Sequence, residues 1–228
     1  MDLGLAGRSC AVTGAGRGIG RATARMLCEA GAQVLLIART ESEVRDAAAE
    51  CGRAGAAAHG RATHLALDVT ALDAAEAVLA EATGRFGVLD VLVNNAGTAK
   101  WRDLDEIPDE DWQAAYDLNV IAPMRLMRAT VPAMAERGWG RVVNVASTAG
   151  KRPSPMMGEY SVAKAAELSL SRLYADRYAS RGQRGLPWAG QVGDVDGPGR
   201  PTRPIPRGRG PRRRARGGRC QAADRPPR

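Results

Sequence analysis

The chain has 228 residues, 33 of them Lys or Arg and 25 Asp or Glu, which gives a formal net charge of +8. Its length favours one domain with or without a tail, and its hydrophobic content of 44% excludes a wholly disordered chain. The charge is unevenly placed, because residues 182–228 hold 12 of the basic and 3 of the acidic groups. That segment has a net charge of +9 and the other 181 residues one of −1, so the basicity belongs to the tail.

Several classes of protein are not expected. The four cysteines show no metal-type spacing and are too few for a disulfide-framed secreted domain. No apolar run reaches the roughly 18–20 residues of a membrane span, and the first residues lack the basic-then-apolar order of a signal peptide. We expect a cytoplasmic protein with neither a metal site nor a membrane partner.

In chain order, short apolar segments alternate with helical ones. The predicted strands cover residues 9–13, 34–37, 63–67, 88–93 and 141–145. The predicted helices cover residues 21–30, 41–51, 71–85, 109–137 and 159–181. This alternation predicts an α/β fold, a doubly wound, Rossmann-like parallel sheet covered by helices on both faces. We expect one dinucleotide-binding and catalytic domain over residues 1–181.

The alternation stops at residue 181. Residues 182–228 combine 10 Gly and 8 Pro with their 12 Arg and show no helix or strand period. Such a segment buries too little apolar surface to offset the entropy of ordering it. We therefore predict a disordered Arg/Gly/Pro-rich tail.

A glycine-rich segment joins the first predicted strand to the first predicted helix, where a dinucleotide pyrophosphate would bind. Glycines permit a tight turn and close approach of the backbone, and the helix N-terminus offers free N–H groups. A glycine-rich connection without a ligand is the alternative. The candidate phosphate-binding residues are Gly14, Ala15, Gly16, Arg17, Gly18, Ile19 and Gly20.

The end of the second predicted strand bears on the choice of cofactor. An Asp or Glu there would bind a ribose 2′-hydroxyl and repel a 2′-phosphate, but this strand leads into Arg39. Arg17 could supply a second positive group to the same phosphate. The sequence therefore favours NADP(H) over NAD(H), unless both arginines are only solvated surface groups.

A tyrosine and a lysine lie four residues apart on one face of the last predicted helix. A nearby cation such as Lys164 would lower the pKa of Tyr160 and make it a usable general acid or base. Ser147 follows the strand at residues 141–145, and residues 94–97 close the preceding strand at the same sheet edge. These groups together predict a reaction centre.

These motifs resemble those of the short-chain dehydrogenase/reductase family, and among its members the 3-oxoacyl-(acyl-carrier-protein) reductases. The resemblance extends over about residues 5–181 and rests on motifs in the expected order. They are the glycine loop from Thr13 to Gly20, Asp68 with Val69, the segment from Asn94 to Gly97, Asn119, Ser147, and Tyr160 with Lys164.

The resemblance implies a role for each position. Tyr160 would donate a proton to a substrate carbonyl, Ser147 would hydrogen-bond the same oxygen, and Lys164 would bind the nicotinamide ribose. Asn119 would hold a water in the proton relay. The cofactor cleft would further contain Arg39, Asp68, Val69, Asn95, Ala96 and Gly97. The implied function is NADP(H)-dependent reduction of a ketone, such as a 3-oxoacyl group, to a secondary alcohol.

After residue 181 the sequence departs from the family pattern, which continues with a strand, a Pro-Gly turn, a substrate lid and a last strand. We expect the sheet to lack its last two strands, with low stability, weak activity and a weakened interface for the family's dimers or tetramers. A shift of reading frame near residue 181 in GC-rich DNA would explain the Arg, Gly, Pro and Ala composition.

Two alternatives remain for the function. One is a cofactor-binding chain that has lost turnover. The other is nucleic-acid binding through the arginine-rich segments 207–210 and 212–219, but the only aromatic residue in the tail is the distant Trp188. We expect a small-molecule substrate and no specific nucleic-acid partner.

Overall fold

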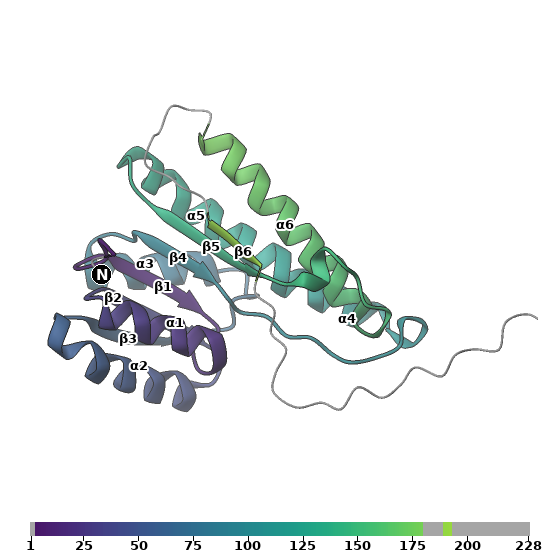
Figure 1. Cartoon of the computed structure of the whole chain (residues 1–228), viewed down its shortest axis with the longest axis horizontal. Coiled ribbons are helices and arrows are strands. Elements are labelled where there is room, and N and C mark those ends of the chain that lie inside the picture. The colour runs from purple at the N-terminus through teal and green to yellow at the C-terminus, as the bar shows by residue number, and fades with distance from the viewer. Residues whose placement is uncertain (1–2, 180–188, 193–228) are drawn as a thin grey trace, which may run out of the picture. The chain divides into compact units, whose positions relative to one another are not determined.

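The computed structural model describes residues 3–179 and 189–192, and within these residues it has one parallel sheet. The strands follow one another in the order β3-β2-β1-β4-β5-β6 across the sheet (Figure 1). Their bounds are β1 Ser9–Thr13, β2 Gln33–Ala38, β3 Arg61–Ala66, β4 Val91–Asn94, β5 Arg141–Ala146 and β6 Ala189–Val192.

Helices cover both faces of the sheet. Their bounds are α1 Gly18–Glu29, α2 Glu41–Gly55, α3 Ala74–Phe86, α4 Asp109–Tyr116, α5 Ala122–Glu136 and α6 Gly158–Ala179. Alternate side chains of β1 pack into opposite layers, with Cys10 and Val12 toward α1 and α2, and Ala11 toward α3 and α5. The doubly wound parallel sheet expected from the sequence is confirmed.

One strand differs from the expectation. β6 pairs in parallel with β5, with Val143 opposite Ala189 and Ala146 opposite Val192. It lies in the segment in which the composition predicted no strand. The sequence predicted a sheet that ends at β5, and this prediction is wrong by one strand. Ala-Gly-Gln-Val has no β-branched run or alternation to signal a strand, and only main-chain pairing with β5 reveals it.

The rest of the predicted tail, including the arginine-rich segments 207–210 and 212–219, lies outside the described residues. In the part of the chain that is described, no helix combines the length and the apolar character needed to cross a membrane.

The parallel register brings the functional loops to one edge of the sheet. Thr13 ends β1 opposite Ile37, and Asn94 ends β4 opposite Asn144. The segments that follow β1, β2, β4 and β5 therefore leave the sheet on the same side, at the carboxyl ends of the strands. Open α/β sheets bind their ligands at this edge.

The long helix predicted over residues 109–137 is interrupted. Residues Asp117–Ile121, labelled η3, form a π-helical turn between α4 and α5. Ala115 and Val120, five residues apart, both pack against Ala163 of α6. Wide turns of this kind are frequent at functional sites, and this one carries Asn119.

Candidate functional site

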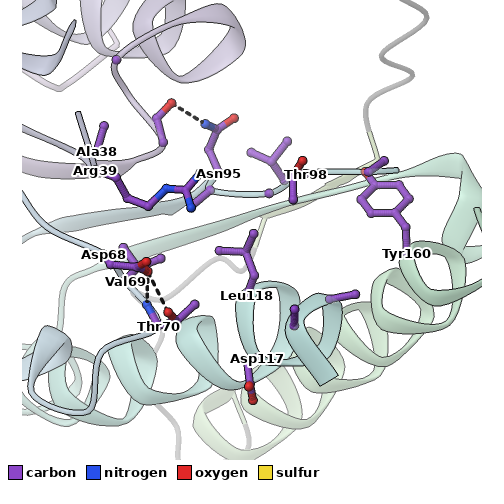
Figure 2. Close-up of a pocket in the computed structure, with 18 of the residues that line it drawn as sticks. Ala38, Arg39, Asp68, Val69, Thr70, Asn95, Thr98, Asp117, Leu118 and Tyr160 are labelled. Carbon is purple, nitrogen blue, oxygen red and sulfur yellow. Dashed lines mark hydrogen bonds between the residues drawn. The ribbon is translucent and has the colours of Figure 1, made fainter. Parts of the chain in front are cut away.

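A cavity of about 670 Å³ lies at the carboxyl edge of the sheet. Figure 2 shows Arg39 and Asp68 at one end and Tyr160 at the other, with Asn95 and Leu118 between them. Segments that follow four strands, together with α4, η3 and α6, contribute to its wall. The cavity therefore joins the predicted phosphate loop to the predicted reaction centre.

The glycine loop is packed so closely that side chains are excluded at two positions. Gly14 has a φ of +64°, and a Cβ there would lie 2.9 Å from the Cα of Ala96. A Cβ on Gly20 would lie 2.4 Å from the carbonyl oxygen of Gly14. These glycines let β1, the start of α1 and the segment after β4 meet.

The start of α1 is suited to an anion. Arg17 occupies the N-cap position without a side-chain capping bond, and the first turn contains no acidic residue. The first N–H groups of the helix therefore meet no side-chain acceptor at the cap and keep the positive end of the helix dipole. A phosphate is the group that such an end of a helix binds well.

A hydrogen-bonded hub ties the glycine loop to the segment after β4. The side-chain hydroxyl oxygen of Thr13 accepts the backbone N–H groups of Asn95 and Ala96, each at 3.0 Å. The side-chain amide of Asn95 donates to the carbonyl oxygens of Thr13 at 2.9 Å and Gly14 at 3.2 Å. Asn95 therefore supports the loop, while its exposed edge lines the cavity.

The end of the cavity near β2 and β3 is charged. Asp68 accepts the backbone N–H of Thr70 at 2.9 Å and its hydroxyl at 2.7 Å (Figure 2). The pKa of Asp68 is lowered first by the bond from the Thr70 N–H, while partial burial opposes it and Arg39 adds a smaller favourable charge. Asp68 is therefore a fixed carboxylate beside the Arg39 guanidinium.

Glu43, which the sequence interpretation did not select, also lies at this end. Its carboxylate oxygen Oε2 would be 3.4 Å from a Cβ on Gly16, and its side chain lines the cavity with Arg17 and Arg39. Glu43 stands in the first turn of α2 after Thr40, a common place for a helix-stabilising acid, so no sequence signal marked it as part of a site.

The reaction centre contains Tyr160, Ser147 and Lys164. The Ser147 hydroxyl lies close enough to Tyr160 to lower its pKa by hydrogen bonding, and the Lys164 Nζ lies 5.7 Å from the centre of the Tyr160 ring. The pKa of Tyr160 is nevertheless raised, because burial dominates and Glu167 adds to it, while the bond with Ser147 opposes them. The expectation that Lys164 lowers this pKa is therefore wrong for the structure as it stands.

Asn119 is held beside the reaction centre by the π-helical turn. Its side-chain amide donates to the Ala115 carbonyl at 2.8 Å, and within the described residues its buried Oδ1 has no partner. A Cβ on Gly97 would lie 3.2 Å from this oxygen and 3.7 Å from the Lys164 Nζ. A buried amide oxygen without a partner is a fitting acceptor for a bound water.

Most residues selected from the sequence share the cavity. Those that line it are Gly14, Gly16, Arg17, Ile19, Arg39, Asp68, Val69, Asn95, Ala96, Gly97, Tyr160 and Lys164. The others stand behind the wall: Ala15 is fully buried, Gly20 packs on Gly14, and Ser147 and Asn119 are buried beside Tyr160 and Gly97. A Cβ on Gly18 would meet open space.

The structure adds a polar group near α4 that the sequence interpretation missed. Asp111 accepts bonds from Lys100 at 2.5 Å and from Arg102 at 2.7 Å. These bonds tie the segment after β4 to the first turn of α4. The three residues lie 9 and 11 positions apart in sequence and follow no periodic pattern, so only the fold brings them together.

Comparison with known proteins identifies relatives for most of the chain. A sequence model described as short chain dehydrogenase matches residues 8–184. The uncharacterized oxidoreductase YvrD of Bacillus subtilis is 35% identical over 176 residues, which are 77% of this chain and 65% of that protein. The 3-oxoacyl-(acyl-carrier-protein) reductase FabG of Vibrio cholerae is 35% identical over 180 residues, 79% of this chain and 71% of that protein.

Coverage of the relatives is incomplete. The short chain dehydrogenase MYCFIDRAFT_6125 of Pseudocercospora fijiensis is 39% identical over 164 residues, which are 71% of this chain but only 52% of that protein. The chain thus spans between about half and two thirds of the length of YvrD and of this fungal relative.

Solved structures share the fold. An NAD+-bound xylitol dehydrogenase superposes with a TM-score of 0.78 at 29% identity, covering 86% of this chain and 73% of the other. The L-sorbose reductase of Gluconobacter frateurii, complexed with NADPH and L-sorbose, has a TM-score of 0.75 at 34% identity, covering 79% and 67%. The two neighbours hold different dinucleotides, so the fold alone does not select between them.

Proposed function

Because this chain belongs to the short chain dehydrogenase family, we propose that it is an oxidoreductase that reduces a ketone to a secondary alcohol with a nicotinamide dinucleotide. The observation that carries the proposal is that one and the same cavity has the glycine loop along one wall and Tyr160 with Lys164 along another. A structural tyrosine–lysine pair would not require a cavity that reaches an uncapped helix end.

The residues of the cavity fit a dinucleotide. The uncapped N-terminus of α1 and the closely packed glycine loop provide room and N–H donors for the pyrophosphate. Asp68 and Val69 would border the adenosine half, while Asn95, Gly97 and Lys164 would border the nicotinamide half. When bound, the reduced nicotinamide supplies the hydride that is added to the carbonyl carbon.

The protein's own side chains supply the proton and position the substrate carbonyl. Tyr160 gives its hydroxyl proton to the carbonyl oxygen, and the neighbouring Ser147 hydroxyl donates a hydrogen bond to the same oxygen. The buried Oδ1 of Asn119, which has no partner within the described residues, supports a role in holding a water from which a proton can return toward Lys164 and Tyr160. The ketone is reduced and the nicotinamide is oxidised.

The cofactor we propose is NADP(H) rather than NAD(H). Within the described residues neither Arg17 nor Arg39 has an acidic group within ion-pair distance, and both line the cavity. The carboxylates of Glu43 and Asp68 at the same end of the cavity would repel a 2′-phosphate, and the two guanidinium groups would attract it. The support for the phosphorylated cofactor is that both arginines lack an ion-pair partner within the described residues and so remain available to the phosphate.

Binding measurements test this preference. The dissociation constants of NADPH and NADH are measured by nucleotide fluorescence for three proteins. These are the unaltered chain, Arg39→Glu and Arg45→Glu. We expect NADPH to bind more tightly than NADH, Arg39→Glu to lose at least about tenfold of that preference, and Arg45→Glu on the exposed face of α2 to keep it. Tighter binding of NADH by the unaltered chain would overturn the proposal.

Turnover tests the reaction. The chain is assayed for NADPH oxidation with a 3-oxoacyl thioester and with keto sugars, because 3-oxoacyl groups and L-sorbose are named for its relatives. Tyr160→Phe should lower kcat about 100-fold or more and leave NADPH binding unchanged. Full turnover by Tyr160→Phe would refute the role of Tyr160. NADPH binding without turnover of any carbonyl would identify the chain as a binding protein only.

A further inference from the structure

Glu167 is a buried acid that the proposed reaction does not use. It lies on α6 one turn after Lys164, and 1% of its surface is exposed. Its Oε2 accepts a hydrogen bond from the Lys164 Nζ at 2.8 Å, and the two side chains are 2% and 4% exposed. Burying a carboxylate is costly unless it has a charged partner, so Glu167 and Lys164 depend on each other.

The pair limits what Lys164 can do. An ammonium group has three N–H donors, and Lys164 gives one to the Val145 carbonyl at 2.8 Å and one to Glu167. One donor is left for another partner on the cavity side. Glu167 and the Val145 carbonyl together therefore fix the position and the direction of the Lys164 head group.

The pair also changes the electrostatics around Tyr160. Lys164 would favour the phenolate form of Tyr160, but the negative charge of Glu167 lies next to the ammonium and offsets it. Burial raises the pKa of Tyr160 and Glu167 raises it further, whereas the bond with Ser147 lowers it. Burial raises the pKa of Glu167 itself, and the charge and the hydrogen bond of Lys164 oppose that rise.

Resting on the function proposed above, we propose that Glu167 is a positioning residue that fixes Lys164 and keeps the Tyr160 hydroxyl protonated, so that Tyr160 enters the reaction as a proton donor. In this step the Tyr160 O–H bond breaks and its proton goes to the carbonyl oxygen, while the hydride goes to the carbonyl carbon. Glu167 itself touches neither substrate nor cofactor, since it acts through Lys164.

Other charged groups also lie around α6, among them the exposed Lys151 and Arg152 in the segment before it. The short helices that precede Tyr160, Thr148–Gly150 and Pro155–Met157, contain no ionisable side chain. α4 and η3 contribute Asp109, Glu110, Asp111 and Asp117, of which Asp111 is paired with Lys100 and Arg102. β5 contributes Arg141, which lies at the opposite end of the strand from Ala146. α6 itself contributes Glu159, a buried acid next to Tyr160 that lines the cavity and whose Oε2 has no hydrogen-bond partner within the described residues. Glu159 has no ion pair with Lys164 in the part of the chain that is described, so it does not fix that ammonium group as Glu167 does.

The experiment titrates Tyr160 directly in the full chain without cofactor. Tyrosinate absorbance is followed against pH, and the curve of Tyr160→Phe is subtracted to isolate this one tyrosine. We expect Glu167→Gln, which removes the charge and keeps the shape, to lower the midpoint of Tyr160 ionisation by about one pH unit. Asp176→Asn is the matched control, because Asp176 has an exposed ion pair with Arg172 on the same helix. That variant should leave the midpoint unchanged.

Glu167→Asp is a charge-retaining variant, and it also tests the proposal if Glu167→Gln does not fold. It retains the charge but draws it away from Lys164, so its midpoint should lie between those of the unaltered chain and Glu167→Gln. If Glu167→Gln fails to fold, a lowered midpoint in Glu167→Asp supports the proposal and an unchanged one overturns it. An unchanged or raised midpoint in a folded Glu167→Gln overturns it as well.

The pH profile of carbonyl reduction separates this inference from the proposed function. In Glu167→Gln, kcat/KM should begin to fall at a pH about one unit lower than in the unaltered chain, because the proton donor is lost earlier. If no carbonyl is reduced but the titration midpoint moves, the proposed function fails and the role of Glu167 in the ionisation of Tyr160 stands. If reduction proceeds with an unmoved midpoint, Glu167 has no such role.

Discussion

Thr13 and Asn95 lie 82 positions apart in sequence and are joined by reciprocal hydrogen bonds between the end of β1 and the segment after β4. The Thr13 hydroxyl oxygen accepts two backbone N–H groups and lies 3.4 Å from the Val93 carbonyl, to which its proton can be donated. These bonds use the full hydrogen-bonding capacity of the Thr13 hydroxyl, and they hold the glycine loop along the wall of the cavity.

The first prediction concerns this hub. Thr13→Val keeps the shape of the side chain but leaves the N–H groups of Asn95 and Ala96 without their acceptor. We expect the free energy of unfolding to fall by about 1–3 kcal/mol in urea denaturation, with weaker NADPH binding. Thr13→Ser retains the hydroxyl, so its free energy of unfolding should fall by less than half as much. Equal losses in the two variants would show that the methyl group, and not the hydroxyl, matters.

The second prediction compares two glycines of one loop. Gly14 and Gly18 both have positive φ, +64° and +57°, but a Cβ would meet Ala96 at 2.9 Å from Gly14 and nothing within 4 Å from Gly18. Gly18→Ala should cost about 1 kcal/mol from backbone strain alone. Gly14→Ala should cost about 1–3 kcal/mol more, because the backbone of β1 and the segment after β4 must separate. Thermal unfolding of both variants measures the difference, and similar values would contradict the close packing.

The third prediction concerns alkaline pH. Burial, with a smaller contribution from the charge of Asp90, raises the pKa of the Cys10 thiol to about 12. The unfolded thiol ionises near its usual pKa of about 8.5, so the native state is fully favoured below that pH and loses stability as pH rises toward 12. Between these values each pH unit should cost up to about 1.4 kcal/mol.

Cys10→Ala removes this dependence. Urea denaturation at about pH 8 and about pH 11 should show a smaller loss of stability in Cys10→Ala than in the unaltered chain, although the variant starts lower by about 1 kcal/mol because of the cavity it creates. Parallel slopes would show that the thiol titrates normally. In the native chain at neutral pH, iodoacetamide should leave Cys10 unmodified, which mass spectrometry of its peptide would detect.

Periodic and motif-based features were predictable from the sequence. Strands such as β1 and β5 are short apolar runs, and the glycine loop, Tyr160 and Lys164 stand at spacings that indicate a cofactor cavity. β6 was not predictable, because main-chain pairing with β5 and not composition defines it.

The electrostatics of the site was also beyond the sequence. Glu167 lies three residues after Lys164, and this spacing is equally common for exposed pairs on a helix surface. The pair affects the pKa of Tyr160 only because both of its side chains are buried. Glu43 and Asp111 likewise join the cavity through tertiary contacts that no local pattern announces.

The π-helical turn at Asp117–Ile121 takes up one residue more than an α-helical turn would. One residue added to a regular α-helix rotates everything after it by about 100° about the axis. Because the wide turn absorbs the extra residue, α5 keeps the phase in which Leu126, Met127 and Val131 are buried against the sheet. A deletion inside α5 itself would have no such turn to absorb it and would rotate the buried residues that follow it away from the sheet.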